Sequence, residues 1–202
     1  MEPISIIVLA GGASQRMGVN KALLTFDGQT LIERVVHTLR PLADDVVIIS
    51  NTPELYANLR VRQASDVFVG AGPLAGLHAG LQAANEAWSF LVACDMPLVD
   101  QRLVRYMSLL TLGHDAVVPC AARQAEPLHA LYHKACLPHI ERRLMEGERR
   151  MISFFSDVHV RFVEPDEWSV IDPDGHSFLN ANTPEDWQRL QTLLSAHQGR
   201  GP

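Results

Sequence analysis

Three short, mainly apolar runs stand out in the first half of the chain, and each one ends in small or polar residues. They cover Ile4–Leu9, Val46–Ile49 and Phe90–Ala93. Continuous apolar runs of this length, bounded by such residues, are typical of strands buried on both faces of a sheet. We therefore predict three buried strands. They are followed by Ala10-Gly11-Gly12, by Ser50-Asn51 and by Cys94-Asp95-Met96-Pro97.

Helical spacing occupies the stretches between these runs. Thr30 and Glu33 have the spacing of a capping box, and the helix that they open should stop before Pro41. Leucines recur at the spacing of one apolar face over Pro73–Ala87, which predicts a second helix. Further elements are predicted as a helix over 102–110, a strand over 116–118, an extended segment over 128–133, a helix over 137–146, a strand over 158–163 and a helix that starts at Thr183-Pro184.

The alternation of strands and helices predicts an α/β fold. Because the strands are apolar throughout, we expect a Rossmann-like three-layer sandwich with a mostly parallel sheet between helices. Residues 1–196 are predicted to form a single domain and residues 197–202 a disordered tail. Ligands of such sheets bind at the carboxyl ends of the strands. This rule selects Ala10–Lys21, Ser50–Asn51, Ser65–Asp66 and Cys94–Asp95.

Composition excludes several classes of protein. Of 202 residues, 47% are hydrophobic and 20% are charged, values close to the globular average that argue against disorder and coiled coil. The formal net charge is −6, which argues against broad nucleic-acid binding. No apolar run approaches the roughly 20 residues of a membrane span. Three cysteines with no zinc-site spacing favour free thiols in a reducing compartment, so we expect a cytoplasmic protein.

The loop that follows the first strand carries the strongest candidate chemistry. It is rich in glycine and contains Arg16 and Lys21 in an otherwise acidic protein. Glycines let the backbone N–H groups approach an anion, and the two cations can neutralise phosphate oxygens. The loop is neither a Walker A loop nor a Gly-x-Gly-x-x-Gly motif. An ordinary loop with solvated charges is the alternative.

Two further features support the same chemistry. Asp95 follows a buried strand, where a carboxylate can hold Mg²⁺ or, alternatively, cap the next helix. The glycine-rich stretch Gly70–Leu77 opens a helix whose N-terminal N–H groups can face a base or a phosphate. Close packing of that helix on the sheet is the other interpretation.

Taken together, these segments resemble a known family. The chain reads Leu-Ala-Gly-Gly-x-Ser-x-Arg-Met-Gly-x-x-Lys, then Gly-Pro-Leu-Ala-Gly, then Cys-Asp-Met-Pro, and finally Asn-Ala-Asn-Thr-Pro-Glu. This order resembles the nucleotidyltransferases with a GT-A-like fold (the nucleotide-diphospho-sugar transferase type), and among them most the molybdenum cofactor guanylyltransferase (MobA) family. The resemblance runs essentially from end to end.

The resemblance implies an activity and a set of site residues. The family transfers GMP from GTP to the terminal phosphate of molybdenum-molybdopterin and releases pyrophosphate. It implies that Leu9, Ala10 and Gly11 contact the guanine and ribose, that Lys21 contacts the triphosphate, that Asn51 and Asp66 make further nucleotide contacts, that Asp95 holds Mg²⁺, and that Asn180 and Asn182 face the pterin. Arg16, Lys21 and Asp95 are thus the expected catalytic residues. Replacing either cation by alanine should cost on the order of 10²-fold in rate, and Asp95→Ala should cost more.

Some alternatives stay open at this stage. A cytidylyltransferase that uses CTP on the same cofactor is the nearest one, followed by a sugar-1-phosphate or isoprenoid nucleotidyltransferase and by a non-catalytic nucleotide-binding adaptor for cofactor delivery. Transient contact with a molybdate-inserting enzyme and with recipient oxidoreductases is expected, and a monomer is plausible. The arginines Arg142, Arg143, Arg149 and Arg150 either meet the second substrate or pair with Glu141, Glu146 and Glu148. Residues 122–129 are expected to line the groove of the second substrate, and the histidines to serve packing or the surface.

Overall fold

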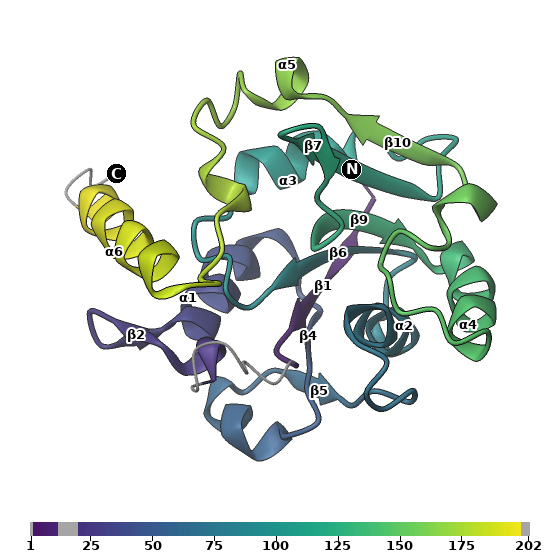
Figure 1. Cartoon of the computed structure of the whole chain (residues 1–202), viewed down its shortest axis with the longest axis horizontal. Helices are drawn as coiled ribbons and strands as arrows, with labels where there is room; N and C mark the ends of the chain where they lie inside the picture. Colours follow the sequence, from purple (N-terminus) through teal and green to yellow (C-terminus); the bar gives the residue numbers. More distant parts are fainter. Residues whose placement is uncertain (1, 12–19, 199–202) are drawn as a thin grey trace.

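The computed structural model describes residues 2–11 and 20–198. Within them, an eight-stranded sheet lies between two layers of helices, with the strand order β10-β7-β9-β6-β1-β4-β5 and β8 paired to β7 (Figure 1). The strands are β1 (Ile4–Leu9), β4 (Val46–Ile49), β5 (Arg62–Ala64), β6 (Trp88–Ala93), β7 (Ala116–Ala121), β8 (Gln124–Ala125), β9 (His129–His133) and β10 (Val160–Val163), with β2 (Thr25–Phe26) and β3 (Gln29–Thr30) in a separate hairpin. The helices are α1 (Leu31–Leu39), α2 (Pro73–Ala83), α3 (Gln101–Ser108), α4 (Leu137–Met145), α5 (Pro165–Trp168) and α6 (Pro184–Gln198).

The central strand β1 shows why the sheet is covered on both sides. All six of its residues are buried, and successive side chains point to opposite faces. Ile6 and Val8 pack in the cluster that includes residues of α1 and α3, whereas Ile7 and Leu9 pack in the cluster that includes residues of α2 and α4. The predicted three-layer α/β sandwich is therefore confirmed.

The sheet is mostly parallel, as predicted, with a mixed half. Strands β4 and β6 pair with β1 in parallel, one on each side, and β5 pairs with β4 in parallel. Strand β9 runs antiparallel to both β6 and β7, and β10 pairs with β7 in parallel. Because β1, β4, β5 and β6 share one direction, the loops that follow them all lie at the same edge of the sheet.

The helix α1 begins as the capping box predicts. The Thr30 hydroxyl oxygen accepts a hydrogen bond from the Glu33 backbone N–H at 3.3 Å, and the Glu33 carboxylate accepts one from the Thr30 N–H at 2.7 Å. The helix ends at Leu39, before Pro41. These bonds satisfy donors at the helix start that have no partner within the helix.

The helix α2 is shorter than predicted, and the difference has a tertiary cause. It ends at Ala83 instead of Ala87. Arg62 donates a hydrogen bond of 2.5 Å to the Ala83 carbonyl, and Asp45 accepts one of 2.8 Å from the Asn85 N–H. The side chains of Arg62 and Asp45, which are distant in sequence, thus bind backbone groups that another helical turn would have used.

Several small elements were not predicted, and the last helix extends further than predicted. These small elements are β5, whose three residues are not apolar throughout, the hairpin β2–β3 and the short strand β8. At the C-terminus, α6 continues to Gln198, two residues into the segment predicted to be disordered, and residues 199–202 lie outside the described part. Among the described residues, no helix is both long and apolar enough to cross a membrane.

Candidate active site

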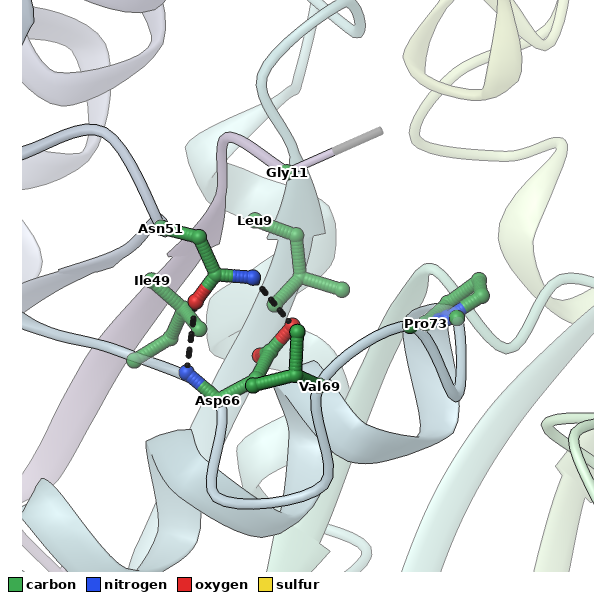
Figure 2. A pocket seen from close by; sticks show the side chains of 10 residues that line it. Leu9, Gly11, Ile49, Asn51, Asp66, Val69 and Pro73 are labelled. Carbon is green, nitrogen blue, oxygen red and sulfur yellow. Dashed lines mark hydrogen bonds between the residues drawn. The ribbon is translucent and has the colours of Figure 1, made fainter. Parts of the chain in front are cut away.

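The carboxyl edge of the parallel strands holds a pocket. Its volume is about 470 Å³, which is in the range of small-molecule sites. The ends of β1 and β4 and the loop before α2 form its walls, and Pro73 lies across the pocket from Asn51 and Ile49 (Figure 2). The lining residues are Leu9, Gly11, Ile49, Asn51, Asp66, Val69, Gly70, Gly72, Pro73 and Gly76.

Asn51 and Asp66 hold each other in a fixed arrangement in the lining of this pocket. The Asn51 amide donates to the Asp66 carboxylate oxygen Oδ2 at 3.1 Å, and the Asp66 N–H donates to the Asn51 Oδ1 at 3.0 Å (Figure 2). The other carboxylate oxygen, Oδ1, is buried and accepts no hydrogen bond from the described residues. Burial raises the pKa of the Asp66 carboxyl, and the hydrogen bond from Asn51 opposes the rise. The pair thus fixes the position of a carboxylate in the pocket lining, with Oδ1 turned toward Gly76 of α2 and Oδ2 toward Asn51.

Glycine is needed where α2 approaches the pocket. A Cβ atom at Gly76 would lie 2.9 Å from Leu9 Cδ2 and 3.8 Å from Asp66 Oδ1. One turn later, a Cβ atom at Gly80 would lie 2.5 Å from Ile7 Cγ2. The glycine-rich helix start therefore combines both interpretations of its sequence: it packs closely on β1, and Gly70, Gly72 and Gly76 line the pocket.

A second cluster lies at the end of β6 and contains four of the predicted residues. The Lys21 ammonium donates to Asn182 Oδ1 at 2.6 Å and to Asp95 Oδ2 at 3.3 Å. The Asn182 amide donates in turn to Asn180 Oδ1 at 2.7 Å. The Lys21 and Asp95 side chains are 17% and 14% exposed, so this ion pair is only partly screened by water. We call Lys21, Asp95, Asn180 and Asn182 the ionic cluster.

The backbone explains how residues so distant in sequence meet. The Cys94 N–H donates to the Leu9 carbonyl at 3.0 Å, and the Ala181 N–H donates to the Asp95 carbonyl at 3.3 Å. Ala181 is buried with Leu31 and Leu190, which fastens the segment between α6 and the sheet edge. Packing of α6 thereby places Asn180 and Asn182 beside Lys21.

Asp95 fits the magnesium site expected from the sequence. Mg²⁺ commonly takes only one or two protein carboxylates and completes its shell with water and substrate phosphates. The described residues contain no group of three or more histidine, cysteine or acidic side chains that could hold a metal ion by themselves. A single carboxylate beside an ammonium group suits an ion that arrives with a nucleotide.

Two predicted residues stand apart from this geometry, and one residue that contacts the glycine-rich loop was not predicted. Arg16 lies outside the described residues, so its role stays a prediction. Ala10 is buried, and its carbonyl accepts a hydrogen bond from the Tyr56 hydroxyl at 3.3 Å. The Asn20 amide donates to the same hydroxyl at 3.0 Å. Tyr56 therefore ties both ends of the glycine-rich loop together, and its isolated place in the sequence gave no signal of this.

The side chains of three of the four arginines have partners among the described residues. Arg142 and Arg143 bind Asp157 at 2.9 and 2.8 Å, and Arg143 also reaches Glu146 at 3.3 Å. The expected pairing with acidic neighbours is thus confirmed for Glu146, while the principal partner, Asp157, was not foreseen. Arg149 instead donates a hydrogen bond to the carbonyl of Gly70 in the pocket wall.

The structure confirms the packing role predicted for His129 and the free thiols predicted for the cysteines. His129 is fully buried between Phe90 and Phe178, with ring centroids 5.0 and 5.1 Å away, and burial lowers its pKa to about 4. It is therefore a neutral packing residue. The thiols of Cys94, Cys120 and Cys136 are all free.

Comparison with known proteins adds an independent result. The model of the MobA-like NTP transferase domain matches residues 6–161. A protein of Desulfosudis oleivorans named molybdenum cofactor guanylyltransferase is 37% identical over 97% of this chain and 98% of its own. A probable molybdenum cofactor guanylyltransferase of Methanosarcina acetivorans is 39% identical over 97% of this chain and 92% of its own.

Solved structures show the same fold. The molybdopterin-guanine dinucleotide biosynthesis protein A of Archaeoglobus fulgidus aligns with a TM-score of 0.85 and 26% identity, over 96% of this chain and all of that one. A cytidylyltransferase of Thermus thermophilus, which acts on 2-C-methyl-D-erythritol 4-phosphate, aligns with a TM-score of 0.72 over 96% of this chain and 100% of its own, but at 18% identity it supports the fold alone. From the family model and the near full-length relatives, it follows that this chain belongs to the MobA-like NTP transferase family.

Proposed function

We propose that the protein transfers GMP from GTP to the terminal phosphate of molybdenum-molybdopterin and releases pyrophosphate. The observation that carries the proposal is the half-buried Asp66 carboxylate, oriented by Asn51, in a pocket large enough for a purine nucleoside. Guanine presents two adjacent donor groups, N1–H and N2–H₂, on one edge, and the Asp66 carboxylate is the acceptor that we propose for this edge. Cytosine offers only one donor group, its N4 amine, so the same acceptor favours guanine.

The apolar part of the pocket supports the same ligand. Leu9, Ile49, Val69 and Pro73 provide apolar surface for a flat base, while Gly11 leaves open space at the end of β1. A base bound here lies at the carboxyl end of the sheet, with its ribose and phosphates free to extend along the edge toward the end of β6. The ionic cluster is at that end.

The reaction needs little from the protein besides alignment and charge. A terminal phosphate oxygen of the acceptor forms a bond to the α-phosphorus of GTP, and the bond from that phosphorus to the bridging oxygen breaks, with pyrophosphate as the leaving group. The attacking oxygen is already an anion, so no strong general base is required. The Lys21 ammonium offsets negative charge on the phosphoryl oxygens, and Arg16 is proposed to do the same. When bound at Asp95, Mg²⁺ would supply further positive charge to the triphosphate and to the departing pyrophosphate.

The second substrate is proposed to lie beside Asn180 and Asn182. Both amides belong to the segment that packs against the end of β6, and Asn182 is exposed. Their donors and acceptors suit the amide-like edge of a pterin. Because Lys21 binds Asn182 as well as Asp95, it lies between the two proposed substrate positions.

The proposal also covers the cellular compartment, the protein partners and the oligomeric state. Three free thiols agree with a reducing compartment, and we infer the cytoplasm. Contact with a molybdate-inserting enzyme and with recipient oxidoreductases stays a prediction from the chemistry of a labile product. The proposal includes a single chain as the working unit.

Calorimetric titration with Mg²⁺ tests the proposal, with GTP compared against CTP on the unsubstituted protein and on Asp95→Ala. Preference for GTP, with a Mg²⁺ dependence that is lost in Asp95→Ala, supports it. Preference for CTP would move the protein to the cytidylyl branch. Binding of GTP without Mg²⁺-dependent pyrophosphate release in the presence of the acceptor would instead favour the adaptor.

A further inference from the structure

One wall of the nucleotide pocket is a loop that apolar packing holds only in part. The loop covers residues 67–72, and we call it the wall loop. Val67 and Val69 are 65% and 79% exposed, so they bury little apolar surface. Gly70 and Gly72 have φ angles of +77° and +73°, in the region that glycine adopts freely. Phe68 and Ala71 pack against the core cluster, whereas the segment around Val69 and Gly70 depends on polar contacts.

One ring contact holds the wall loop from the side of α2, and one hydrogen bond closes a turn within the loop. The Phe68 ring meets the His78 ring edge to face, with centroids 5.2 Å apart. The Ala71 N–H donates to the Phe68 carbonyl at 3.1 Å, which closes a turn. Neither of these contacts involves the carbonyl of Gly70.

Arg149 holds the wall loop from the opposite side. Its guanidinium group donates a hydrogen bond to the Gly70 carbonyl. Its own backbone carbonyl lies 4.0 Å from the place that a Cβ atom would take at Gly72, so the two segments run in contact. Arg149 reaches the pocket wall from outside, without lining the pocket itself.

The segment that presents Arg149 is itself well anchored. Gly147 follows α4 with a φ angle of +85°, and its N–H donates to the Leu144 carbonyl at 3.0 Å. The Glu148 N–H donates to the Arg143 carbonyl at 2.9 Å, which completes a Schellman motif. The Arg143 side chain is bound to Asp157 at 2.8 Å. A rigid helix end therefore sets the position from which Arg149 reaches Gly70.

We propose that Arg149 is a positioning residue for the nucleoside end of GTP, which acts by fixing the wall loop. This inference rests on the proposed function, because it takes the pocket as the guanosine site. The guanidinium group binds a backbone carbonyl and no reacting atom, so its contribution belongs to nucleotide binding and not to the chemical step. Loss of one charge-assisted hydrogen bond at an exposed position corresponds to about tenfold in affinity.

The test compares Arg149→Met with Arg150→Met, which removes the same charge from the adjacent exposed residue. Affinities for GTP, GMP and pyrophosphate are measured by calorimetry, and KM and kcat for GTP by pyrophosphate release. Arg149→Met should bind GTP and GMP about tenfold more weakly, by the same factor, and pyrophosphate normally. The KM for GTP should rise by that factor while kcat at saturating GTP stays unchanged. Arg150→Met should bind all three ligands like the unsubstituted protein.

Four outcomes would overturn the inference. The first three are a GTP affinity in Arg149→Met equal to that of the unsubstituted protein, an equal weakening of GTP binding in the two variants, and weaker GTP binding without any change for GMP. The last two of these would assign the effect to charge near the phosphates. A melting temperature of Arg149→Met well below that of Arg150→Met would assign it to general destabilisation. Failure of the unsubstituted protein to bind GTP would contradict the proposed function itself.

Discussion

The base pocket and the ionic cluster are organised in different ways, although they share one edge of the sheet. In the pocket, Asn51 and Asp66 hold each other through two hydrogen bonds, and both residues are uncharged or acidic. In the ionic cluster, Lys21 already binds both Asp95 and Asn182. In the proposed complex, the nucleoside meets a pair that is already ordered, whereas phosphates that reach Lys21 compete with its partners Asp95 and Asn182. The pocket is therefore suited to selection of the base, and the cluster to a response when the substrates arrive.

Removal of the proposed metal ligand should have the largest effect and tests whether the pocket and the ionic cluster have separate roles. Asp95→Ala should lower turnover on the order of 10³-fold, because the variant loses both the proposed ligand of Mg²⁺ and the partner of Lys21. Steady-state pyrophosphate release measures this. Guanosine binding, which depends on the pocket, should be unchanged. Asp44→Ala, at an exposed aspartate, is the control. Normal turnover in folded Asp95→Ala would remove the metal assignment.

Removal of the bridging cation should cost somewhat less. Lys21→Met should slow turnover on the order of 10²-fold, or about 3 kcal/mol in activation free energy, since a single cation stops stabilising the phosphoryl oxygens. Single-turnover kinetics with saturating GTP isolates this step. Guanosine affinity should again match the unsubstituted protein, and a large loss there would show that pocket and cluster are not separate.

The reverse experiment changes the pocket and leaves the cluster intact. Asp66→Asn should weaken GTP binding by about 30-fold, since a neutral amide is a poorer acceptor for the guanine N–H groups. Stability should stay equal or rise. Because burial raises the pKa of Asp66 above its unfolded value, the carboxyl contributes stability below its unfolded pKa that is lost as pH rises through the folded pKa. Calorimetry and urea unfolding give the two quantities, with Asp44→Asn as the control. A marked loss of stability with unchanged GTP affinity would make Asp66 a structural residue.

Acidification provides the same contrast without a substitution. Guanosine binding needs the ionised carboxylate, so its affinity should fall as pH decreases through the raised pKa of Asp66, at a higher pH than an exposed aspartate near 3.9 would give. We expect a decline of about tenfold per pH unit below that pKa. Titrations from about pH 8 to pH 4 should show this decline in the unsubstituted protein and a flat profile in Asp66→Asn. Parallel profiles would assign the titration to another group.

The smallest predicted effect concerns the close approach of α2 to β1. Gly76→Ala places a methyl group 2.9 Å from Leu9 Cδ2, next to Asp66, and should weaken GTP binding a few-fold while it destabilises the fold by about 1 kcal/mol. Gly80→Ala is the matched control, since its methyl group meets Ile7 and not the pocket wall. It should destabilise the fold by about 2 kcal/mol and leave GTP affinity unchanged. Equal affinity losses would mean that the pocket responds to any shift of α2.

The sequence predicted best those features that neighbouring residues decide. The apolar runs of β1 and β4 carried their own bounds, and the capping box of α1 needs only residues three positions apart. Prediction from the sequence failed where a side chain that is distant in sequence binds the backbone. Helix α2 ends at Ala83 because Arg62 binds the Ala83 carbonyl and Asp45 binds the Asn85 N–H. Strand β5 escaped detection because its pairing with β4, and not its own three residues, makes it a strand.

The site follows the same division. The sequence by itself determined that glycines, cations and carboxylates come directly after parallel strands, and strand direction then brings Asn51, Asp66 and Asp95 to one edge. Only the tertiary structure decided that Asn51 orients Asp66, that Tyr56 ties the ends of the glycine-rich loop together and that Arg149 holds Gly70. The reason is physical. Propensity and periodicity act over a few residues of chain, whereas a hydrogen bond between side chains far apart in the sequence depends on distances that exist only once the core has packed.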